Sequence, residues 1–263
     1  MSESQSDAVV LVDRADGIGT VTLNRPDKLN ALNRELRLAF CHAMQDLRRD
    51  PDVRVVIITG AGRAFCVGLD LRELGTKSSG IRDEGNATFI TVIEDMEVPV
   101  IGAINGFAIT GGFEMALACD IMIAAEEAQF ADTHARVGVM PGGGMSARLP
   151  RAVGIRKAKE MSLTGNYIAA RDAQRMGLVN RVVPRDQLIA AAREMATQIT
   201  TANQTIVRQM KQLYDRTTRT TLADAMAIEQ EAFNDFNRKA NLGELAQAGD
   251  SVIARGRTQA AKS

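Results

Sequence analysis

The residues best suited to chemistry lie at a strand-to-helix junction in segment 104–114. Gly111 and Gly112 begin an apolar helix, and the first N–H groups of a helix have no partner within it. These amides, with the positive end of the helix dipole behind them, suit the stabilisation of an oxyanion. Glu114 follows on the same side of the helix, where its carboxylate could exchange a proton next to a carbonyl group.

A structural explanation of the same residues competes with the chemical one. The two glycines could serve only tight packing, and Glu114 could be a solvated helix charge. A second notable segment, residues 64–71, is expected to be an apolar loop that follows a buried strand. The residues of these two segments alone leave both explanations open.

The amino-acid composition argues against several functional classes of protein. The chain has 263 residues, of which 45% are hydrophobic and 24% charged, as in ordinary globular proteins. The 32 basic and 32 acidic residues give no net charge, which argues against a general nucleic-acid binder. Three widely spaced cysteines and two histidines exclude a disulfide framework, a CxxC zinc site and a multi-histidine metal centre. We expect the cysteines to be small buried apolar residues.

Common catalytic motifs are missing from the sequence. No segment matches a phosphate-binding loop, a dinucleotide fingerprint, HExxH or GxSxG. No apolar run approaches the length of about 18 residues that a membrane span needs. The first seven residues are polar and lack the basic segment of a signal peptide. We therefore expect a soluble, cytoplasmic protein that acts through backbone amides and a few acid/base side chains, without nucleic-acid or membrane partners.

Alternating strands and helices predict an α/β core with mostly parallel strands. Strands are expected at 8–13, 18–23, 53–59, 99–104 and 121–124, with another beginning near Phe130, and helices at about 32–47, 89–96 and 113–119. Beyond Pro184 the sequence predicts helices at 187–200, 203–214, 221–239 and 242–255. The expected organisation is an α/β core over residues 1–190 and a helical C-terminal region over 191–263, which packs on the core or on a neighbouring subunit.

Five blocks of sequence, in this order and spacing, carry a resemblance to a known family. They are Asn24-Arg25-Pro26 through Asn30-Ala31-Leu32, the segment 65–71, Ile104-Asn105-Gly106 through Glu114, Cys119-Asp120, and Phe130 through Gly138, Pro141 and Gly142. The chain resembles the enoyl-CoA hydratase/isomerase (crotonase) superfamily. This resemblance implies a ββα spiral core, an acyl-CoA substrate, and homotrimers that commonly pair into homohexamers.

The resemblance also implies roles for particular residues. The backbone N–H groups of Leu69 and Gly111 would hold the thioester oxygen, and Leu69 is bulkier than the alanine common in hydratases. Glu114 matches the first of the two glutamates that act on the water and the α-carbon. The residues expected along the coenzyme A path are Asp27, Lys28, Leu29, Ala31, Cys66, Val67, Gly68, Leu69, Asp70, Leu71, Arg72, Gly111 and Pro141, with Lys28 and Arg72 as phosphate partners. Segment 75–91 would shape the acyl pocket.

The second glutamate of the family pattern is replaced by His134. Because an imidazole has an ordinary pKa near 6.5, it can exchange a proton at neutral pH. His134 could replace the acid/base group of a hydratase, or it could mark a different reaction of the superfamily, or it could be structural. His42, on the first predicted helix, is expected to be a surface residue.

The reaction that the resemblance implies is addition of water across the 2,3 double bond of a 2-enoyl-CoA. It would need no metal or redox cofactor, and coenzyme A would arrive as part of the substrate. Two alternatives stay open: an isomerase or acyl-CoA lyase that uses Glu114 alone, and a non-catalytic acyl-CoA-binding protein.

Overall fold

The computed structural model describes residues 8–74, 88–239, 249, 252–258 and 260. The chain divides into two compact units, Met1–Arg208 and Gln209–Ser263. Among the helices of the described residues, none has the length and apolar character that crossing a membrane requires.

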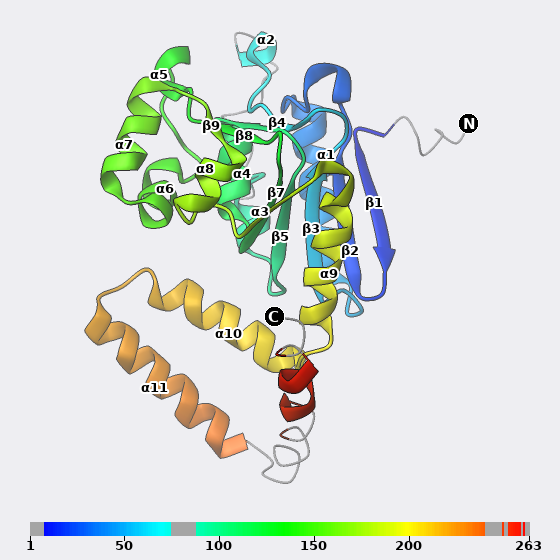
Figure 1. Cartoon of the computed structure of the whole chain (residues 1–263), viewed down its shortest axis with the longest axis vertical. Coiled ribbons are helices and arrows are strands. Elements are labelled where there is room, and N and C mark those ends of the chain that lie inside the picture. Colours follow the sequence, from blue (N-terminus) through cyan, green and yellow to red (C-terminus); the bar gives the residue numbers. More distant parts are fainter. Residues whose placement is uncertain (1–7, 75–87, 240–248, 250–251, 259, 261–263) are drawn as a thin grey trace. The chain divides into compact units, whose positions relative to one another are not determined.

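The first unit is built around a six-stranded sheet (Figure 1). Its strands, in spatial order, are β1 (Val10–Ala15), β2 (Ile18–Leu23), β3 (Val55–Gly60), β5 (Val100–Ile104), β7 (Ile121–Ala125) and β10 (Arg181–Val183). β1 and β2 form an antiparallel hairpin, and every other neighbouring pair is parallel.

A second sheet of four short strands carries the residues of interest. It runs in the order β4 (Ala64–Cys66), β6 (Phe107–Ile109), β8 (Gln129–Ala131) and β9 (Ile168–Ala169). β4, β6 and β8 are parallel neighbours, whereas β9 is antiparallel to β8. The carboxyl ends of three adjacent parallel strands therefore lie at one edge of this sheet.

The helices of the first unit connect and cover the two sheets. They are η1 (Pro26–Lys28), α1 (Arg34–Arg49), α2 (Leu71–Leu74), α3 (Thr91–Glu94), α4 (Gly111–Ala118), α5 (His134–Val137), α6 (Met145–Val153), α7 (Ile155–Thr164), α8 (Ala170–Arg175), η3 (Arg185–Gln187) and α9 (Leu188–Thr200). α10 (Gln204–Thr217) crosses the division between the units, and α11 (Leu222–Lys239) lies in the second.

The central strands β3, β5 and β7 of the six-stranded sheet are buried on both faces, as the continuous apolar run in β3 predicts. Alternate residues of β3 enter two different apolar clusters. Val56 and Ile58 pack in the larger cluster with the apolar face of α1, whereas Val55 and Ile57 face α9, which runs along the sheet in Figure 1. The helices on the two faces thus hold the strands that precede the site.

The expected mixed α/β fold, with parallel strands and C-terminal helices, is confirmed. Residues 64–66, expected to be part of a loop, form strand β4, because their edge pairs with β6. The expected boundary after residue 190 falls inside α9, which packs on the sheet, and the chain divides instead after Arg208. The predicted helix at 242–255 lies largely outside the described residues.

Two buried asparagines hold the turn between β3 and β4. The Asn30 side-chain amide donates to the carbonyl oxygens of Ala61 at 3.0 Å and Ala64 at 2.8 Å, and its own oxygen accepts from the Arg25 N–H at 2.8 Å. Asn105 donates to the Ala64 carbonyl at 3.0 Å from the opposite side. These bonds satisfy backbone groups that cannot pair within a strand.

We predict that Asn30→Ala lowers the free energy of unfolding by about 2–4 kcal/mol, because it leaves buried carbonyl groups without donors. Urea denaturation followed by circular dichroism measures this change. Asn166→Ala is the matched control, since Asn166 is exposed and its replacement should change stability by less than about 0.5 kcal/mol. Equal effects of the two substitutions would contradict the role of Asn30.

Candidate active site

Three loops that follow β4, β6 and β8 form the site. Gly68 comes two residues after β4, Thr110 directly after β6, and Asp132 directly after β8. Ligands of parallel sheets commonly bind beyond the carboxyl ends of the strands. The order β4-β6-β8 therefore explains why segments far apart in the sequence meet here.

The amides of Leu69 and Gly111, which the sequence predicts as the oxygen-binding pair, lie close to each other. A Cβ atom placed on Gly111 would be 3.7 Å from the Leu69 nitrogen. A Cβ atom placed on Gly68, whose φ is +88°, would be 3.0 Å from the Gly111 nitrogen. In the part of the chain that the structure describes, no group accepts a hydrogen bond from either amide. Two adjacent, unpaired main-chain donors can hold one anionic oxygen.

Thr110 turns the chain from β6 into α4 with an unusual backbone. Its φ of 52° and ψ of −113° lie outside the regions that a threonine normally adopts. The conformation is held by a hydrogen bond from its N–H to the Ala131 carbonyl at 2.9 Å, and by a contact of 2.5 Å between the Thr110 and Thr133 hydroxyl oxygens. Backbone strain held by surrounding bonds is typical of functional sites.

Glycine occupies the first two positions of α4 for two different reasons. A Cβ atom on Gly112 would lie 2.0 Å from the Cys66 carbonyl oxygen, so this position requires glycine for close packing on β4. A Cβ atom on Gly111 would come no closer than 3.4 Å to any atom. The packing explanation therefore accounts for Gly112, and the free amide distinguishes Gly111.

Glu114 is buried in the first turn of α4 and is held by main-chain donors. The residue is only 4% exposed, and its Oε1 accepts from the Gly143 N–H at 2.8 Å and the Met145 N–H at 3.3 Å. The Arg148 guanidinium donates to the Gly143 carbonyl at 2.8 Å and pairs with Glu94. Glu114 is therefore a fixed, buried carboxylate and not a solvated helix charge.

His134 lies between two carboxylates. Its Nδ1 is 2.6 Å from Asp132 Oδ1, and its Nε2 is 3.9 Å from Glu114 Oε2. The residue is 7% exposed and forms the start of α5. The two predicted acid/base residues are thus brought together, and the imidazole has a partner on each side.

Asp132 has a lowered pKa. Burial by itself would raise it, but hydrogen bonds from the His134 ring, the Ser162 side chain and the His134 backbone N–H, together with attraction to the His134 charge, outweigh that effect. The carboxylate is therefore ionised at neutral pH.

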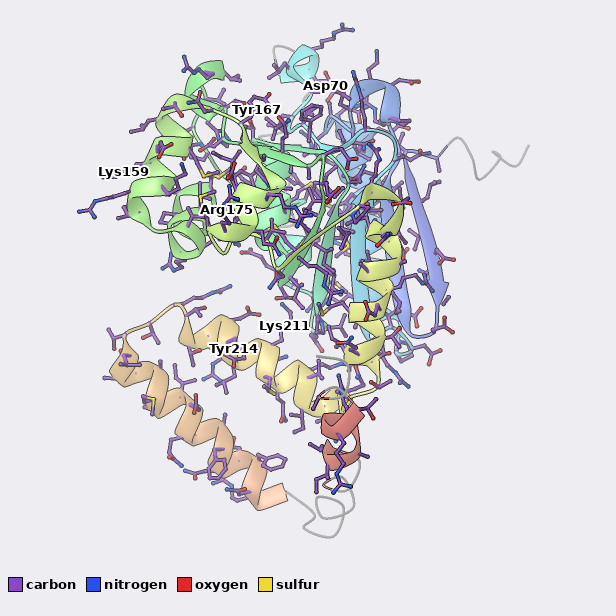
Figure 2. The ribbon with its side chains drawn as sticks, in the orientation of Figure 1. Asp70, Lys159, Tyr167, Arg175, Lys211 and Tyr214 are labelled. Atoms are coloured by element: carbon purple, nitrogen blue, oxygen red, sulfur yellow. The ribbon has the colours of Figure 1, made fainter. Side chains whose placement is uncertain are left out.

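Except for Gly111 and Pro141, the expected coenzyme A residues lie in or beside two adjacent loops, 27–31 and 66–72. Leu32 N–H donates to the Gly68 carbonyl at 2.8 Å, which joins the loop after β2 to the loop after β4. The Arg25 guanidinium spans the same loops, donating to the Ala31 carbonyl at 2.5 Å and pairing with Asp70 at 3.4 Å. Asp70 lies just before α2 (Figure 2).

The other residues expected along the coenzyme A path differ in their exposure to solvent. Asp27, Lys28, Leu71 and Arg72 are exposed, whereas Leu29, Val67 and Pro141 are half-buried. Cys66 is buried, and that burial raises the pKa of its thiol to about 12, against a smaller lowering by the Gly68 N–H. The thiol is therefore neutral near pH 7, in agreement with the expected apolar role. Of segment 75–91, which was expected to shape the acyl pocket, residues 75–87 lie outside the described residues.

Sequence reasoning missed three groups that the structure places in or beside the site. They are Asp132, Arg25 and the amides of Gly143 and Met145. An aspartate two residues before a histidine is a signal for Asp132, since such a side chain readily bonds the backbone two residues on. The long-range contacts of Arg25 and of the two amides have no local signal.

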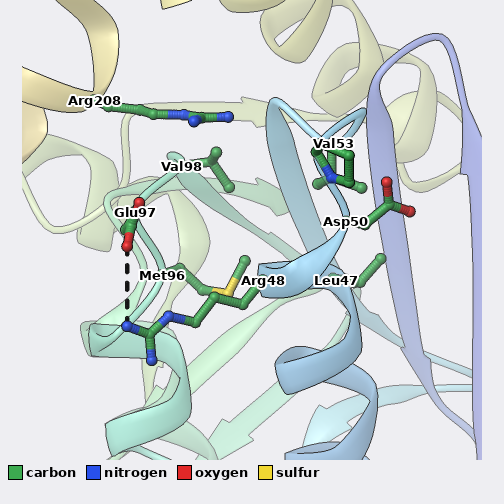
Figure 3. A pocket seen from close by; sticks show the side chains of 9 residues that line it. Leu47, Arg48, Asp50, Val53, Met96, Glu97, Val98 and Arg208 are labelled. Carbon is green, nitrogen blue, oxygen red and sulfur yellow. Dashed lines mark ion pairs between the residues drawn. The ribbon is translucent and has the colours of Figure 1, made fainter. Parts of the chain in front are cut away.

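A separate hollow lies at the end of α1 (Figure 3). Its lining includes Leu47, Met96 and Val98, with Arg48 and Glu97 paired at 4.0 Å. None of the acid/base residues described above lines it.

Comparisons with known proteins agree on one family. The sequence profile of the family described as enoyl-CoA hydratase/isomerase matches residues 13–248. A probable peroxisomal enoyl-CoA hydratase 1 of Arabidopsis thaliana is 39% identical over 232 residues, covering 88% of each chain.

Solved structures give the same result. An enoyl-CoA hydratase from Mycobacterium smegmatis is 48% identical, with a TM-score of 0.72, over 88% of this chain and 99% of that one. An enoyl-CoA hydratase from Bacillus anthracis is 33% identical, with a TM-score of 0.83, over 92% of this chain and 96% of that one.

We predict that Asp132→Asn lowers the free energy of unfolding by about 1–3 kcal/mol at pH 7, since it removes a charged acceptor. Because the folded-state pKa of Asp132 is lowered, its stabilisation is present above the ordinary pKa of an aspartate. It is lost as the pH falls through the folded-state value. The difference between wild type and variant should therefore shrink below about pH 4.

Urea unfolding at a series of pH values between 7 and 3 measures this difference. Asp46→Asn, at an exposed position of α1, is the control and should show little difference at any pH. A difference for Asp132→Asn that stays constant over the whole series would contradict a stabilising charge.

Proposed function

This chain belongs to the enoyl-CoA hydratase/isomerase family, and from that premise we propose that it adds water across the 2,3 double bond of a 2-enoyl-CoA. One observation carries the proposal: two facing acid/base groups, Glu114 on α4 and His134 at the start of α5, accompany two unpaired main-chain amides, one at the start of α4 and one in the loop after β4. The hydratase names of the relatives agree with it.

In the proposed reaction, the thioester carbonyl oxygen lies between the Leu69 and Gly111 amides. Attack of water at C3 moves electrons toward that oxygen and gives an enolate. Donors that are already in place stabilise this charge without reorganisation, and removal of one such donor typically costs about 10²–10³ in rate. Because both donors are main-chain groups, the bulk of the Leu69 side chain does not prevent this role.

The gap between Glu114 and His134 is suited to one water molecule. A water about 2.8 Å from each of two atoms that are 3.9 Å apart subtends an angle of about 90° at its oxygen. Such a water can donate to Glu114 Oε2 and donate to or accept from His134 Nε2. We propose that this is the water that adds to the substrate.

The coenzyme A part of the substrate is proposed to run along the joined loops 27–31 and 66–72. The exposed cations Lys28 and Arg72 are the proposed phosphate partners. The proposed reaction moves protons and one hydroxyl group, and it needs no metal or redox cofactor; coenzyme A enters as part of the substrate.

Assembly into a homotrimer or homohexamer is also proposed. The second unit, taken by itself, exposes large apolar side chains on α10 and α11, with Tyr214 65%, Leu222 80% and Phe233 57% exposed. Exposure of several large apolar side chains supports contact with another chain. The cytoplasmic location stays a prediction from the sequence, since one relative is named as peroxisomal.

We predict that Glu114→Gln and His134→Ala each lower kcat for hydration of crotonyl-CoA and of a longer 2-enoyl-CoA by about 10² or more. Each removes one proton-transfer partner of the water. The measurement follows loss of the enoyl thioester absorbance over pH 5–9. His42→Ala is the control, because His42 is exposed on α1 and its loss should leave the rate unchanged.

The alternatives give different outcomes. Loss of activity in Glu114→Gln but not in His134→Ala would favour a reaction that uses Glu114 alone, such as isomerisation or lyase chemistry. Wild-type protein that binds enoyl-CoA without turnover on hydratase, isomerase or lyase substrates would favour an acyl-CoA-binding protein.

We also predict that Gly68→Ala lowers kcat/KM by about 10² or more. The added methyl group would lie 3.0 Å from the Gly111 nitrogen and obstruct the oxygen site. Gly177→Ala is a matched control, because Gly177 has a similar φ of +80° and its Cβ would meet no atom closer than 3.8 Å. Both variants carry backbone strain, so equal losses of activity would contradict the oxyanion role.

A further inference from the structure

We propose that Asp132 is a positioning residue that fixes the proton of His134 on Nδ1 and so makes Nε2 the atom that exchanges a proton with the substrate. The inference rests on the proposed function for its chemistry. Its structural part, the tautomer of His134, can be tested independently of any turnover.

The Asp132 carboxylate is itself held in place. Oδ1 accepts the His134 backbone N–H at 3.2 Å as well as the ring Nδ1 at 2.6 Å, and the Ser162 side chain on α7 also bonds this carboxylate. The residue is only 2% exposed. A buried carboxylate with donors from its own turn and from a neighbouring helix has little freedom to release the ring.

An ionised carboxylate accepts hydrogen bonds and cannot donate them. The short contact with Asp132 therefore requires a proton on His134 Nδ1. In the neutral imidazole, Nε2 is then an acceptor, and it faces Glu114 Oε2 at 3.9 Å. A continuous series of hydrogen-bond donors and acceptors then runs from Asp132 through His134 and the proposed water to Glu114.

This series of groups assigns the two proton transfers of hydration to different residues, one to Glu114 and one to His134. Glu114, whose Oε1 accepts two main-chain N–H groups, removes a proton from the water with its other oxygen, Oε2, which faces His134. The water oxygen forms the bond to C3, the double-bond electrons move to the thioester oxygen, and imidazolium Nε2 gives its proton to C2. The proton left on Glu114 then returns to Nε2, which restores the starting state without any further reactant.

The charges around the imidazolium favour this assignment. The carboxylates of Asp132 and Glu114 are the acidic groups that face its two nitrogens, and no other carboxylate of the described residues lies within 4.0 Å of them. Arg136, on the same helix, directs its guanidinium to the Thr164 carbonyl at 2.7 Å. Each ring nitrogen of His134 therefore faces a carboxylate of another residue.

Nitrogen-15 NMR of the imidazole rings tests the tautomer directly. The chain has two histidines, and exposed His42 serves as an internal reference, assigned through His42→Gln. We expect neutral His134 in wild-type protein to carry its proton on Nδ1, whereas exposed His42 should show a mixture of the two neutral tautomers. A His134 protonated on Nε2, or a mixture like that of His42, would overturn the proposal.

Kinetics of Asp132 variants test the consequence. We expect Asp132→Asn to lower kcat by about 10² or more with a small change in KM, and to move the high-pH limb of the kcat profile to lower pH, because the imidazolium loses a stabilising charge. Asp132→Glu, which keeps the charge, should recover part of the rate, and Asp46→Asn should match wild type. An unshifted profile in folded Asp132→Asn would overturn the proposal.

The two tests separate this inference from the proposed function. If wild-type protein hydrates no enoyl-CoA but His134 holds its proton on Nδ1 only while Asp132 is present, the positioning role stands and the hydratase function fails. If hydration proceeds and the tautomer does not depend on Asp132, the function stands and the positioning role is overturned.

Discussion

The junction at Thr110 is the constraint on which the site depends. Its positive φ turns the chain so that the next residue, Gly111, presents a free amide and begins the helix that carries Glu114. Its hydrogen bonds to Ala131 and Thr133 tie the same point to the loop that carries Asp132 and His134. One strained residue therefore fixes the Gly111 amide, proposed to bind the thioester oxygen, relative to both Glu114 and His134.

The four-stranded sheet places this junction between two neighbouring strands, because Thr110 follows β6, which pairs with β4 and β8. Its parallel strands β4, β6 and β8 are only three residues long each, so they contribute little stability by themselves. They are held by the buried turn residues Asn30 and Asn105 and by the close approach of Gly112 to Cys66. The large sheet, whose central strands are buried on both faces, supplies the rigid base from which these short strands extend.

Much of this arrangement could be predicted from local sequence. Buried β-branched runs identified the central strands, and the glycine pair identified the start of α4, because both signals depend on near neighbours. The short strand β4 was taken for a loop, since three residues show no clear period and its partner β6 is 41 or more positions away. The family resemblance supplied Leu69 and His134, which no local pattern would have singled out.

The residues that prediction missed are those whose roles depend on distant partners. Arg25 joins two loops through its contact with Asp70, which lies 45 positions later in the sequence. The amides of Gly143 and Met145 donate to Glu114 from a segment 29 or more positions later. Asp132 was visible in the sequence but had no assigned role, because its importance follows from the orientation of the His134 ring.

The proposed orientation of the His134 ring also offers an explanation of how a histidine could stand where the family pattern has its second glutamate. A single glutamate has a charge of −1 when ionised and 0 when protonated. A fixed Asp132 carboxylate with His134 has the same two values: −1 plus 0 when the ring is neutral, and −1 plus +1 when it is protonated. The pair therefore exchanges one proton with the same change in charge as the missing glutamate. An imidazole without Asp132 would instead change from 0 to +1 beside Glu114, which is why the proposed exchange of the glutamate for His134 includes the aspartate two residues before it.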